Sequence, residues 1–377
     1  MGFVRDLEEG DLSRVAKLYQ KMNGGRYSGS HRALESYFRD IFFDNPWNQE
    51  SISSLVYEEK NEGVVGFLGV IPRRMCFQGS IIKVAVGNNF MVDPEFRTSM
   101  AGIQLLKKFF AGPQDLSLTD GANELVRRAW EGCGGVASQL YSMHWRRPLR
   151  PTQYLMRLLM ESGFLKAAHR LTRPVCYMLD SLFVRVQGSP FYLSEPALQY
   201  EELDEISLQE CITHFAADRL LFPVYDANSL GWLLDMLAQK QSYGSLHKAL
   251  IRDEENKILG WYLYLLKPGE NAQVVQVGGS SQTIKEVLEC LIFDAWRNGA
   301  LALNGRLDPR FMQTFSELYC FFDQSASGTL IQSKNSCIIQ AFLQGDAFFT
   351  RLEGEWWLRT REVLNGYDSF SVSRRKR

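Results

Sequence analysis

The chain has 377 residues, of which 45% are hydrophobic and 23% are charged, and its formal net charge is −1. This length suits two domains of ordinary size, with enough apolar residues for their cores. The near-neutral charge argues against a nucleic-acid partner, and no apolar run approaches the ~20 residues that a membrane-spanning helix needs.

The ends of the chain and its cysteines bear on location and cofactors. The opening MGFVRDLEEGDLSRVAKL has no apolar signal region, and Asp6 stands where a myristoylation motif needs Ser or Thr. The seven cysteines have no C-x-x-C spacing, and the five histidines have no ligand spacing. We therefore expect a cytoplasmic protein that holds no metal.

Apolar periodicity in the first part of the chain predicts a strand, two helices, three strands, a helix, a strand, a helix and a strand. The corresponding segments are 2–7, 10–22, 29–46, 51–59, 63–79, 80–94, 100–110, 116–120, 121–135 and 136–149. This order is typical of an α+β domain with one mixed sheet.

The pattern changes over residues 150–189. Residues 152–174, TQYLMRLLMESGFLKAAHRLTRP, predict one basic amphipathic helix. Such a helix is typical of a membrane surface or of a connector that packs on two domains. We favour the connector, because two similar-looking halves flank it. The basic clusters at Arg146, Arg147 and Arg150, and at 374–377, are expected to be solvated surface.

The second half repeats the order of elements loosely, which indicates an internal duplication. We therefore expect a first domain over residues 1–149, a linker helix over 150–189 and a second domain over 190–377.

One strand–turn–helix stretch, FMVDPEFRTSMAGIQLLKKFF, has the outline of a phosphate-binding turn. A helix N-terminus leaves backbone N–H groups unpaired and carries partial positive charge, so a tight loop entering it can hold a diphosphate. Gly102 lets an anion approach the main chain, and Arg97 adds charge. Met100 stands where glycine is expected, and methionine does not favour a positive φ.

On this motif and on the order of elements over residues 4–149, the first half resembles the GNAT superfamily of N-acyltransferases. The resemblance implies an α+β fold of two tandem GNAT-like domains, each a mixed, mainly antiparallel sheet flanked by helices. It implies acetyl-CoA, or another acyl-CoA, as cosubstrate and direct attack by a primary amine in the first domain. The implied cosubstrate contacts are Phe90, Met91, Val92, Arg97, Thr98, Ser99, Met100, Ala101, Gly102 and Asn123.

The family's usual acid and base are missing from their places. Trp130 stands where relatives often have a tyrosine that protonates the leaving thiolate, and an indole N–H is no acid at neutral pH. Asn88 and Asn89 stand where a carboxylate is common. Asp120, Tyr141 and His144 are the substitute candidates, with Glu124 as a further base.

Alternatives to a working transferase remain open. The loop of the second half, Gly278 to Ser281, lacks the arginine, so we expect a degenerate domain whose glycines and serines cap a helix. The chain can also be an inactive GNAT-like scaffold, or a transferase of the peptidoglycan-bridge type, although its charge argues against tRNA. The acceptor is expected to be a small-molecule or sugar amine, and the sequence leaves open whether the chain forms a homo-oligomer.

Overall fold

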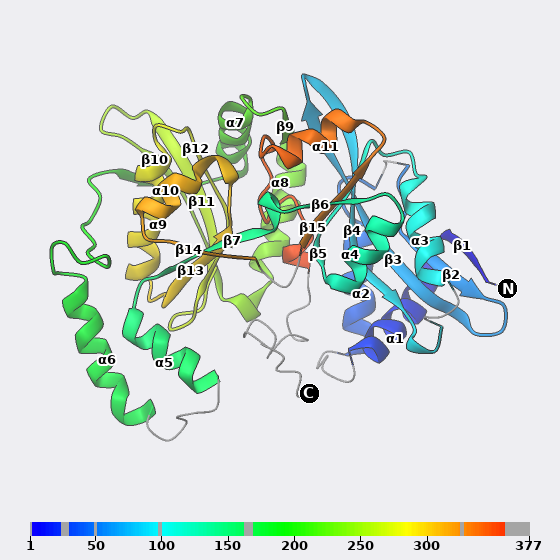
Figure 1. Ribbon diagram of the computed structural model, residues 1–377, viewed down its shortest axis with the longest axis horizontal. Helices are drawn as coiled ribbons and strands as arrows, with labels where there is room; N and C mark the ends of the chain where they lie inside the picture. The colour runs from blue at the N-terminus through cyan, green and yellow to red at the C-terminus, as the bar shows by residue number, and fades with distance from the viewer. Residues whose placement is uncertain are drawn as a thin grey trace.

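The computed structural model describes residues 2–23, 30–48, 51–96, 100–161, 169–324 and 328–358. Two mixed β-sheets lie side by side and are flanked by helices (Figure 1). This arrangement confirms the predicted α+β class with a sheet in each half.

Sheet A is formed mostly by the first half of the chain. Its strand order is β1-β2-β3-β4-β5-β15-β6, with β9 pairing along β3. The strands are β1 (Phe3–Asp6), β2 (Leu55–Glu59), β3 (Gly63–Phe77), β4 (Ser80–Val92), β5 (Leu116–Ala122), β6 (Val136–Ser138), β9 (Leu221–Pro223) and β15 (Gly328–Ser333). β4 and β5 run parallel, whereas the neighbouring pairs β3–β4 and β5–β15 are antiparallel.

Sheet B has the same plan, in the order β14-β7-β13-β12-β11-β10-β8. The strands are β7 (Met143–Pro148), β8 (Gln199–Glu201), β10 (Ser245–Arg252), β11 (Ile258–Leu266), β12 (Ala272–Gly279), β13 (Ala302–Arg306) and β14 (Phe321–Gln324). Here β12 and β13 are the parallel pair.

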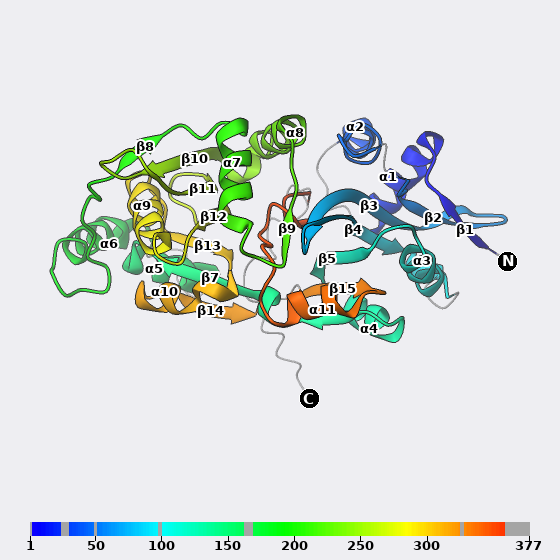
Figure 2. The same cartoon turned by 90° about the horizontal axis from the view of Figure 1, so that it is seen from above.

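The two halves exchange their last strands. β7 leaves the first half and lies between β13 and β14, whereas β15 leaves the second half and lies between β5 and β6 (Figure 2). Sheet membership therefore does not change at a single point of the chain. The expected boundaries after residues 149 and 189 stay a prediction about folding units.

Helices cover both faces of each sheet. They are α1 (Leu12–Met22), α2 (His31–Phe42), α3 (Ala101–Phe110), α4 (Glu124–Gly132), α5 (Pro151–Glu161), α6 (His169–Phe183), α7 (Glu205–Ala216), α8 (Ala227–Ala238), α9 (Ile284–Arg297), α10 (Met312–Glu317) and α11 (Ser336–Leu343). α3 packs on one face of sheet A, and α1 and α2 pack on the other, where they share one apolar cluster with α7 and α8. The halves thus have a common core.

Two expected elements are divided in the structure. The strand predicted over 136–149 is split into β6 and β7 by a 3-10 turn, Leu140–Ser142, where the chain passes from sheet A to sheet B. The helix predicted over 152–174 is two helices, and α6 continues past Pro174 to Phe183. Proline removes one backbone donor, but it does not end this helix.

The arginine cluster predicted to be solvated instead fastens α5 and its approach to sheet B. Arg147 is buried and donates to Pro190 O, and Arg150 donates to Trp296 O and Ala300 O, both at 3.0 Å. Arg146 donates to Tyr154 Oη at 3.0 Å. The second basic cluster, at 374–377, lies outside the described residues.

The segment 346–358 runs between the two sheets. Arg351 Nη1 donates to Gln273 Oε1 on β12 and to Asn304 O on β13. On the other side, Glu355 N donates to Asp120 Oδ1 on β5 at 2.6 Å. The approach is close, because a Cβ added at Gly354 would lie 2.3 Å from Asp120 Cγ.

A buried ion pair also joins the halves. Arg306, at the end of β13, donates to Asp120 Oδ2, and both side chains are almost inaccessible to solvent. Arg306 also donates to Tyr141 O and to Thr329 Oγ1 at 2.6 Å. A guanidinium with these partners stabilises the place where β5, β13 and β15 meet.

We predict that the chain unfolds in one cooperative transition and that Arg306→Met lowers its stability by about 3–5 kcal/mol, since Asp120 would then be a buried charge without its cation. Scanning calorimetry and urea denaturation measure both. Two separable transitions, or an unchanged midpoint for the variant, would contradict this account of the strand exchange.

Candidate functional site

β4 and β5 separate toward their C-terminal ends. Their parallel ladder covers only Val84–Val86 against Leu116–Leu118. β4 continues to Val92, while the far edge of β5 stays paired with β15 as far as Ala122. The result is a wedge between β4 and β5 in which backbone polar groups face each other without a ladder.

A β-bulge lies on β4 beside this wedge. The register between β3 and β4 shifts between Phe67 and Gly69, and Asn89 has a φ of 47°. A bulge leaves one residue outside the ladder and turns its backbone groups. It lies directly before Phe90, Met91 and Val92, the residues expected to present an N–H group.

The N-terminus of α3 lies against the same end of β4. A Cβ added at Gly102 would lie 3.3 Å from Phe90 Cζ and 3.5 Å from Val92 Cγ2. The first N–H groups of a helix have no partner within the helix, and those of Ala101 and Gly102 begin α3 at this end of β4. The structure therefore brings together two parts of the predicted site.

Met100 adopts the conformation that the sequence argument held to be unfavourable for methionine. It is the N-cap residue of α3, with φ 60° and ψ 5°, and its side chain is 57% exposed. The loop therefore keeps a positive φ at this position although the residue is methionine rather than glycine. Arg97, Thr98 and Ser99 lie outside the described residues.

Asn123 caps a helix at the end of β5. Its side chain accepts a hydrogen bond from Val126 N at 3.0 Å and caps α4. It is exposed near the open end of the wedge. This capping bond does not test the predicted contact between Asn123 and the cosubstrate, which stays a prediction.

Of the acid–base candidates, Asp120 and Tyr141 already bond to other groups of the protein. Asp120 is paired with Arg306 and with Glu355 N. Tyr141 Oη donates to Ala347 O at 2.6 Å and accepts from Ala347 N at 2.8 Å, and burial raises the pKa of its hydroxyl. This geometry gives no support to proton transfer by either group.

The remaining candidates lie away from the wedge or are poor bases. His144 is on β7 in sheet B, where its Nδ1 lies 3.3 Å from Ser142 O. Hydrogen bonds from Arg127 and Arg128 lower the pKa of the exposed Glu124 to about 2. Trp130 is buried against Phe109 and Phe110 as a core residue.

An arginine that the sequence did not single out lies on the interdomain side of β3. Arg73 is buried, and none of its three guanidinium nitrogens has a hydrogen-bond partner among the described residues. Its guanidinium lies 3.9 Å from the ring centroid of Trp47 and 5.6 Å from that of Trp357. Burial lowers its pKa to about 10.

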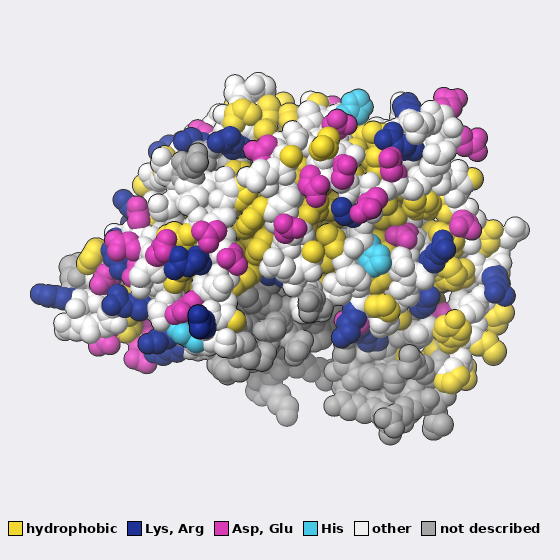
Figure 3. Space-filling view, turned by 180° about the vertical axis from the view of Figure 1, so that it is seen from behind, with side chains coloured by type: hydrophobic (Ala, Val, Ile, Leu, Met, Phe, Trp, Pro, Cys, Tyr) yellow, Lys and Arg dark blue, Asp and Glu magenta, His cyan; other side chains and the backbone are white. Residues whose placement is uncertain are grey.

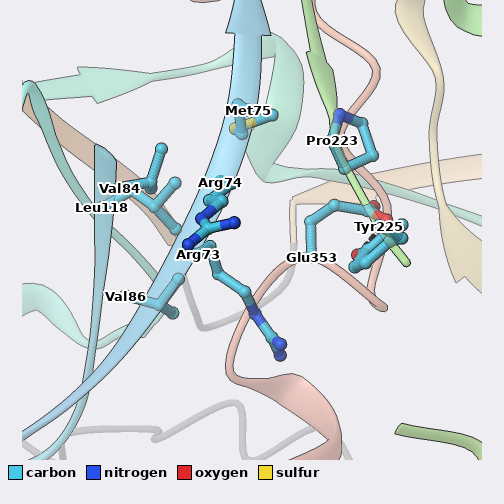
Figure 4. A pocket seen from close by; sticks show the side chains of 9 residues that line it. All are labelled: Arg73, Arg74, Met75, Val84, Val86, Leu118, Pro223, Tyr225 and Glu353. Carbon is cyan, nitrogen blue, oxygen red and sulfur yellow. Dashed lines mark hydrogen bonds between the residues drawn. The ribbon is translucent and has the colours of Figure 1, made fainter. Parts of the chain in front are cut away.

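Figure 4 shows how this arginine faces the second half of the chain. Arg73 reaches from β3 past the level of Val86, and Tyr225 and Glu353 lie opposite, around a cavity of about 10 Å3. This volume is near the lower limit for one water molecule. Glu353 is already satisfied by Tyr225, Gln276 and Thr350.

A second buried side chain with an unpaired donor lies on β4, the strand next to β3. Asn88 Nδ2 is buried without a hydrogen-bond partner in the described part of the chain. Its Oδ1 lies over Gly69, where an added Cβ would come within 2.6 Å. Buried donors without partners are costly. Asn88 lies next to the bulge, whereas Arg73 pairs with Val84 further back along the β3–β4 ladder, so the two mark separate positions for polar contacts on sheet A.

The matching wedge in sheet B is different. β12 and β13 pair only at Ala272 and Gln273, and Arg351 donates to the backbone of both strands beyond that point. A cavity of about 190 Å3 lies at the open end and is lined by His214, Phe215, Asp218, Arg219, Gly279, Ser280, Ser281, Arg310, Phe311 and Phe348.

The side chains of the loop before α9 bond within the turn that leads into the helix. Ser280 Oγ accepts from Thr283 N, and Thr283 Oγ1 accepts from Ser280 N. The positive side chains at this cavity also have partners, because Arg310 pairs with Asp218 and Arg219 pairs with Asp308. The N-cap residue of α9, Thr283, makes no side-chain capping bond, so the capping role of Gly278 to Ser281 stays a prediction.

No group of three or more His, Cys, Asp or Glu side chains arranged to hold a metal ion is present in the described ranges.

Comparison with solved structures shows which fold the chain has. The chain is similar to a GCN5-related N-acetyltransferase from Anabaena variabilis, with a TM-score of 0.56, 12% identity, and coverage of 89% of this chain and 74% of that one. The fold is that of the GNAT superfamily. No protein-family model matches the sequence, and a search of curated proteins finds no match.

Two further solved structures extend the likeness over most of this chain. A probable N-acyltransferase from Enterococcus faecalis has a TM-score of 0.56 at 11% identity and covers 92% of this chain and 74% of its own. The N-myristoyltransferase of Saccharomyces cerevisiae, solved with myristoyl-CoA, has a TM-score of 0.50 at 11% identity, with 88% and 78% covered.

We predict that Met100→Gly raises the free energy of unfolding by about 1 kcal/mol, because glycine adopts a positive φ without the steric cost that methionine carries. Urea denaturation measures the change. Ala101→Gly, one residue inside the helix, is the control and should destabilise by about 1 kcal/mol. Destabilisation by Met100→Gly would show that the thioether makes contacts worth more than the strain.

We predict that Arg73→Met stabilises the ligand-free protein by about 1 kcal/mol. An unpaired buried guanidinium costs several kcal/mol, which exceeds the ~2 kcal/mol of a desolvated cation–π contact. Arg351→Met is the matched control, because that guanidinium is equally buried but has partners, and it should destabilise. If Arg73→Met destabilises as strongly, its charge is satisfied within the protein.

Proposed function

We propose that this chain is an acyl-CoA-dependent N-acyltransferase whose chemistry takes place at the wedge of sheet A. One observation supports this most: the bulge at Asn89 and the N-terminus of α3 lie together at the open end of the wedge between β4 and β5. Unpaired amides of a helix start suit a diphosphate, and an open strand edge suits an extended amide-containing arm.

The cosubstrate contacts follow from this placement. The N–H groups of Ala101 and Gly102, with Arg97 to Ser99, would hold the diphosphate of acyl-CoA. An N–H group between Phe90 and Val92 would polarise the thioester carbonyl, as an oxyanion donor does. A side chain at Gly102 would press on Phe90, so this position leaves little room for anything larger than hydrogen.

The reaction would be direct transfer. The amine nitrogen attacks the thioester carbonyl carbon, a C–N bond forms and the C–S bond breaks. The thiolate of CoA leaves, and the proton lost by the amine ends on that thiolate or in solvent. Neither Asp120 nor Tyr141 is free to carry it, so the rate would depend on positioning and on carbonyl polarisation.

The acceptor would approach from the interdomain side. Arg73 and Asn88 both leave buried donors unpaired on this side of sheet A. These donors suit an acceptor that carries an oxygen acceptor or an anionic group besides its amine. The amine itself remains a small-molecule or sugar amine in our proposal, with acetyl-CoA as the first acyl donor to test.

Particular residues favour a second function. Met100 at a positive φ, the buried Trp130 and the occupied Asp120 fit a GNAT-fold protein that binds a ligand without catalysis. A peptidoglycan-bridge type of aminoacyl transfer has less support, because the net charge of −1 offers little attraction to tRNA.

We predict that CoA and acetyl-CoA raise the melting temperature in a concentration-dependent way, because a ligand that binds only the folded state stabilises it. Gly102→Val should lose at least tenfold in CoA affinity and keep its fold. Gly279→Val on the matching loop of the second half is the control and should keep CoA binding. Loss of binding in the control alone would move the cosubstrate to sheet B.

Thiol release on a panel of amines separates the two functions. Release of CoA with an amine present, and not without it, supports the transferase. A melting shift without thiol release on any amine supports the binding protein. No shift at millimolar CoA would contradict the transferase and favour a scaffold that binds another ligand or partner.

A further inference from the structure

α5 and α6 form a helical pair at the sheet-B end of the molecule, far from the sheet-A wedge (Figure 1). α6 uses one narrow stripe for packing. Cys176, Asp180 and Val184, spaced four residues apart, are buried. Asp180 accepts from the N–H groups of Thr152 and Gln153, which ties α6 to the start of α5.

Between Val175 and Phe183, most of the other side chains of α6 are apolar and exposed. A stripe that is 38% to 60% accessible to solvent consists of Val175, Met178, Leu179 and Leu182 on α6, and of Val186, three residues after its end. Tyr177 and Phe183 on α6, and Leu155 and Leu159 on α5, are exposed as well. Figure 3 shows hydrophobic side chains gathered along this edge, with Lys or Arg beside them. An exposed apolar face of this extent marks an interaction surface.

The same segment is rich in positive charge. Residues 151–186 contain five Lys or Arg residues and two acidic ones, Glu161 and Asp180. Asp180 is buried against α5, so it contributes little at the surface. An apolar helix face in a segment of net positive charge is typical of helices that lie in the interface of an anionic membrane.

We propose that the exposed face of α6, the stripe from Val175 to Val186, binds the surface of an anionic lipid bilayer. The charge decides between this partner and a second copy of the chain. Two copies would bring their basic residues together, whereas anionic headgroups neutralise them. The surface thus favours a membrane-surface helix over the connector that the sequence analysis preferred.

The helix would lie along the bilayer rather than cross it. α6 has 15 residues and is roughly 22 Å long at 1.5 Å per residue, less than the ~30 Å hydrocarbon layer. The described helices include none that is long and apolar enough to span a bilayer. This binding does not depend on the proposed transferase activity.

Co-sedimentation of the full chain with lipid vesicles tests the proposal. We expect at least tenfold stronger binding to phosphatidylcholine vesicles containing about 30% phosphatidylglycerol than to phosphatidylcholine alone, and weaker binding as salt rises. The double variant M178E/L182E should lose at least tenfold in binding to the anionic vesicles. Both residues are exposed, so its melting temperature should stay near that of the wild type.

The control variant is I206E/F321E. It replaces two equally exposed apolar residues elsewhere and makes the same change in net charge. It should bind vesicles like the wild type. Equal loss in both variants would reduce the effect to charge alone and overturn the α6 surface. So would absence of vesicle binding, or a wild-type dimer in light scattering that M178E/L182E dissociates.

Discussion

Two parallel strands that separate leave backbone N–H and C=O groups without a ladder, and each such group needs another partner. β4 and β5 pair over three residues and then diverge. This constraint organises the rest of sheet A. A bulge lies at Asn89 on β4, β15 pairs the far edge of β5, and the N-terminus of α3 brings amides that have no partner within their helix to the same end.

The two halves meet this constraint in different ways. In sheet B, Arg351 donates to the carbonyl groups of Val274 and Asn304 where β12 and β13 separate. In sheet A, the segment 346–358 reaches β5 through Glu355 and Gly354, beside Asp120. One crossing segment therefore supplies partners to both sheets. The difference is that Arg351 bonds to backbone carbonyl groups of both separating strands in sheet B, whereas the contact with sheet A is to the Asp120 side chain. This gives a physical reason, besides the loop residues, to propose a working site in one half only.

The sequence predicted the features that depend on residues close together in the chain. The stripe Leu12, Val15 and Tyr19 set the buried face of α1, and the phosphate-type turn was found from its order of strand, loop and helix. The exchange of β7 and β15 was not predictable, because the apolar pattern of a strand does not indicate which of the two sheets it joins. Arg73 was missed for a similar reason, since its burial depends on Trp47 and Trp357 from distant parts of the chain. Asp120 read as a free carboxylate because its cation, Arg306, comes from the other half.

Hydrogen–deuterium exchange with and without CoA tests the central claim most directly, because it reports on the amides themselves. The account predicts that CoA slows exchange in peptides covering residues 87–106, where β4 ends and α3 begins. Peptides covering 278–290, the matching part of the second half, should exchange at an unchanged rate. Protection confined to 278–290, or none in either segment at saturating CoA, would contradict a cosubstrate site at the sheet-A wedge.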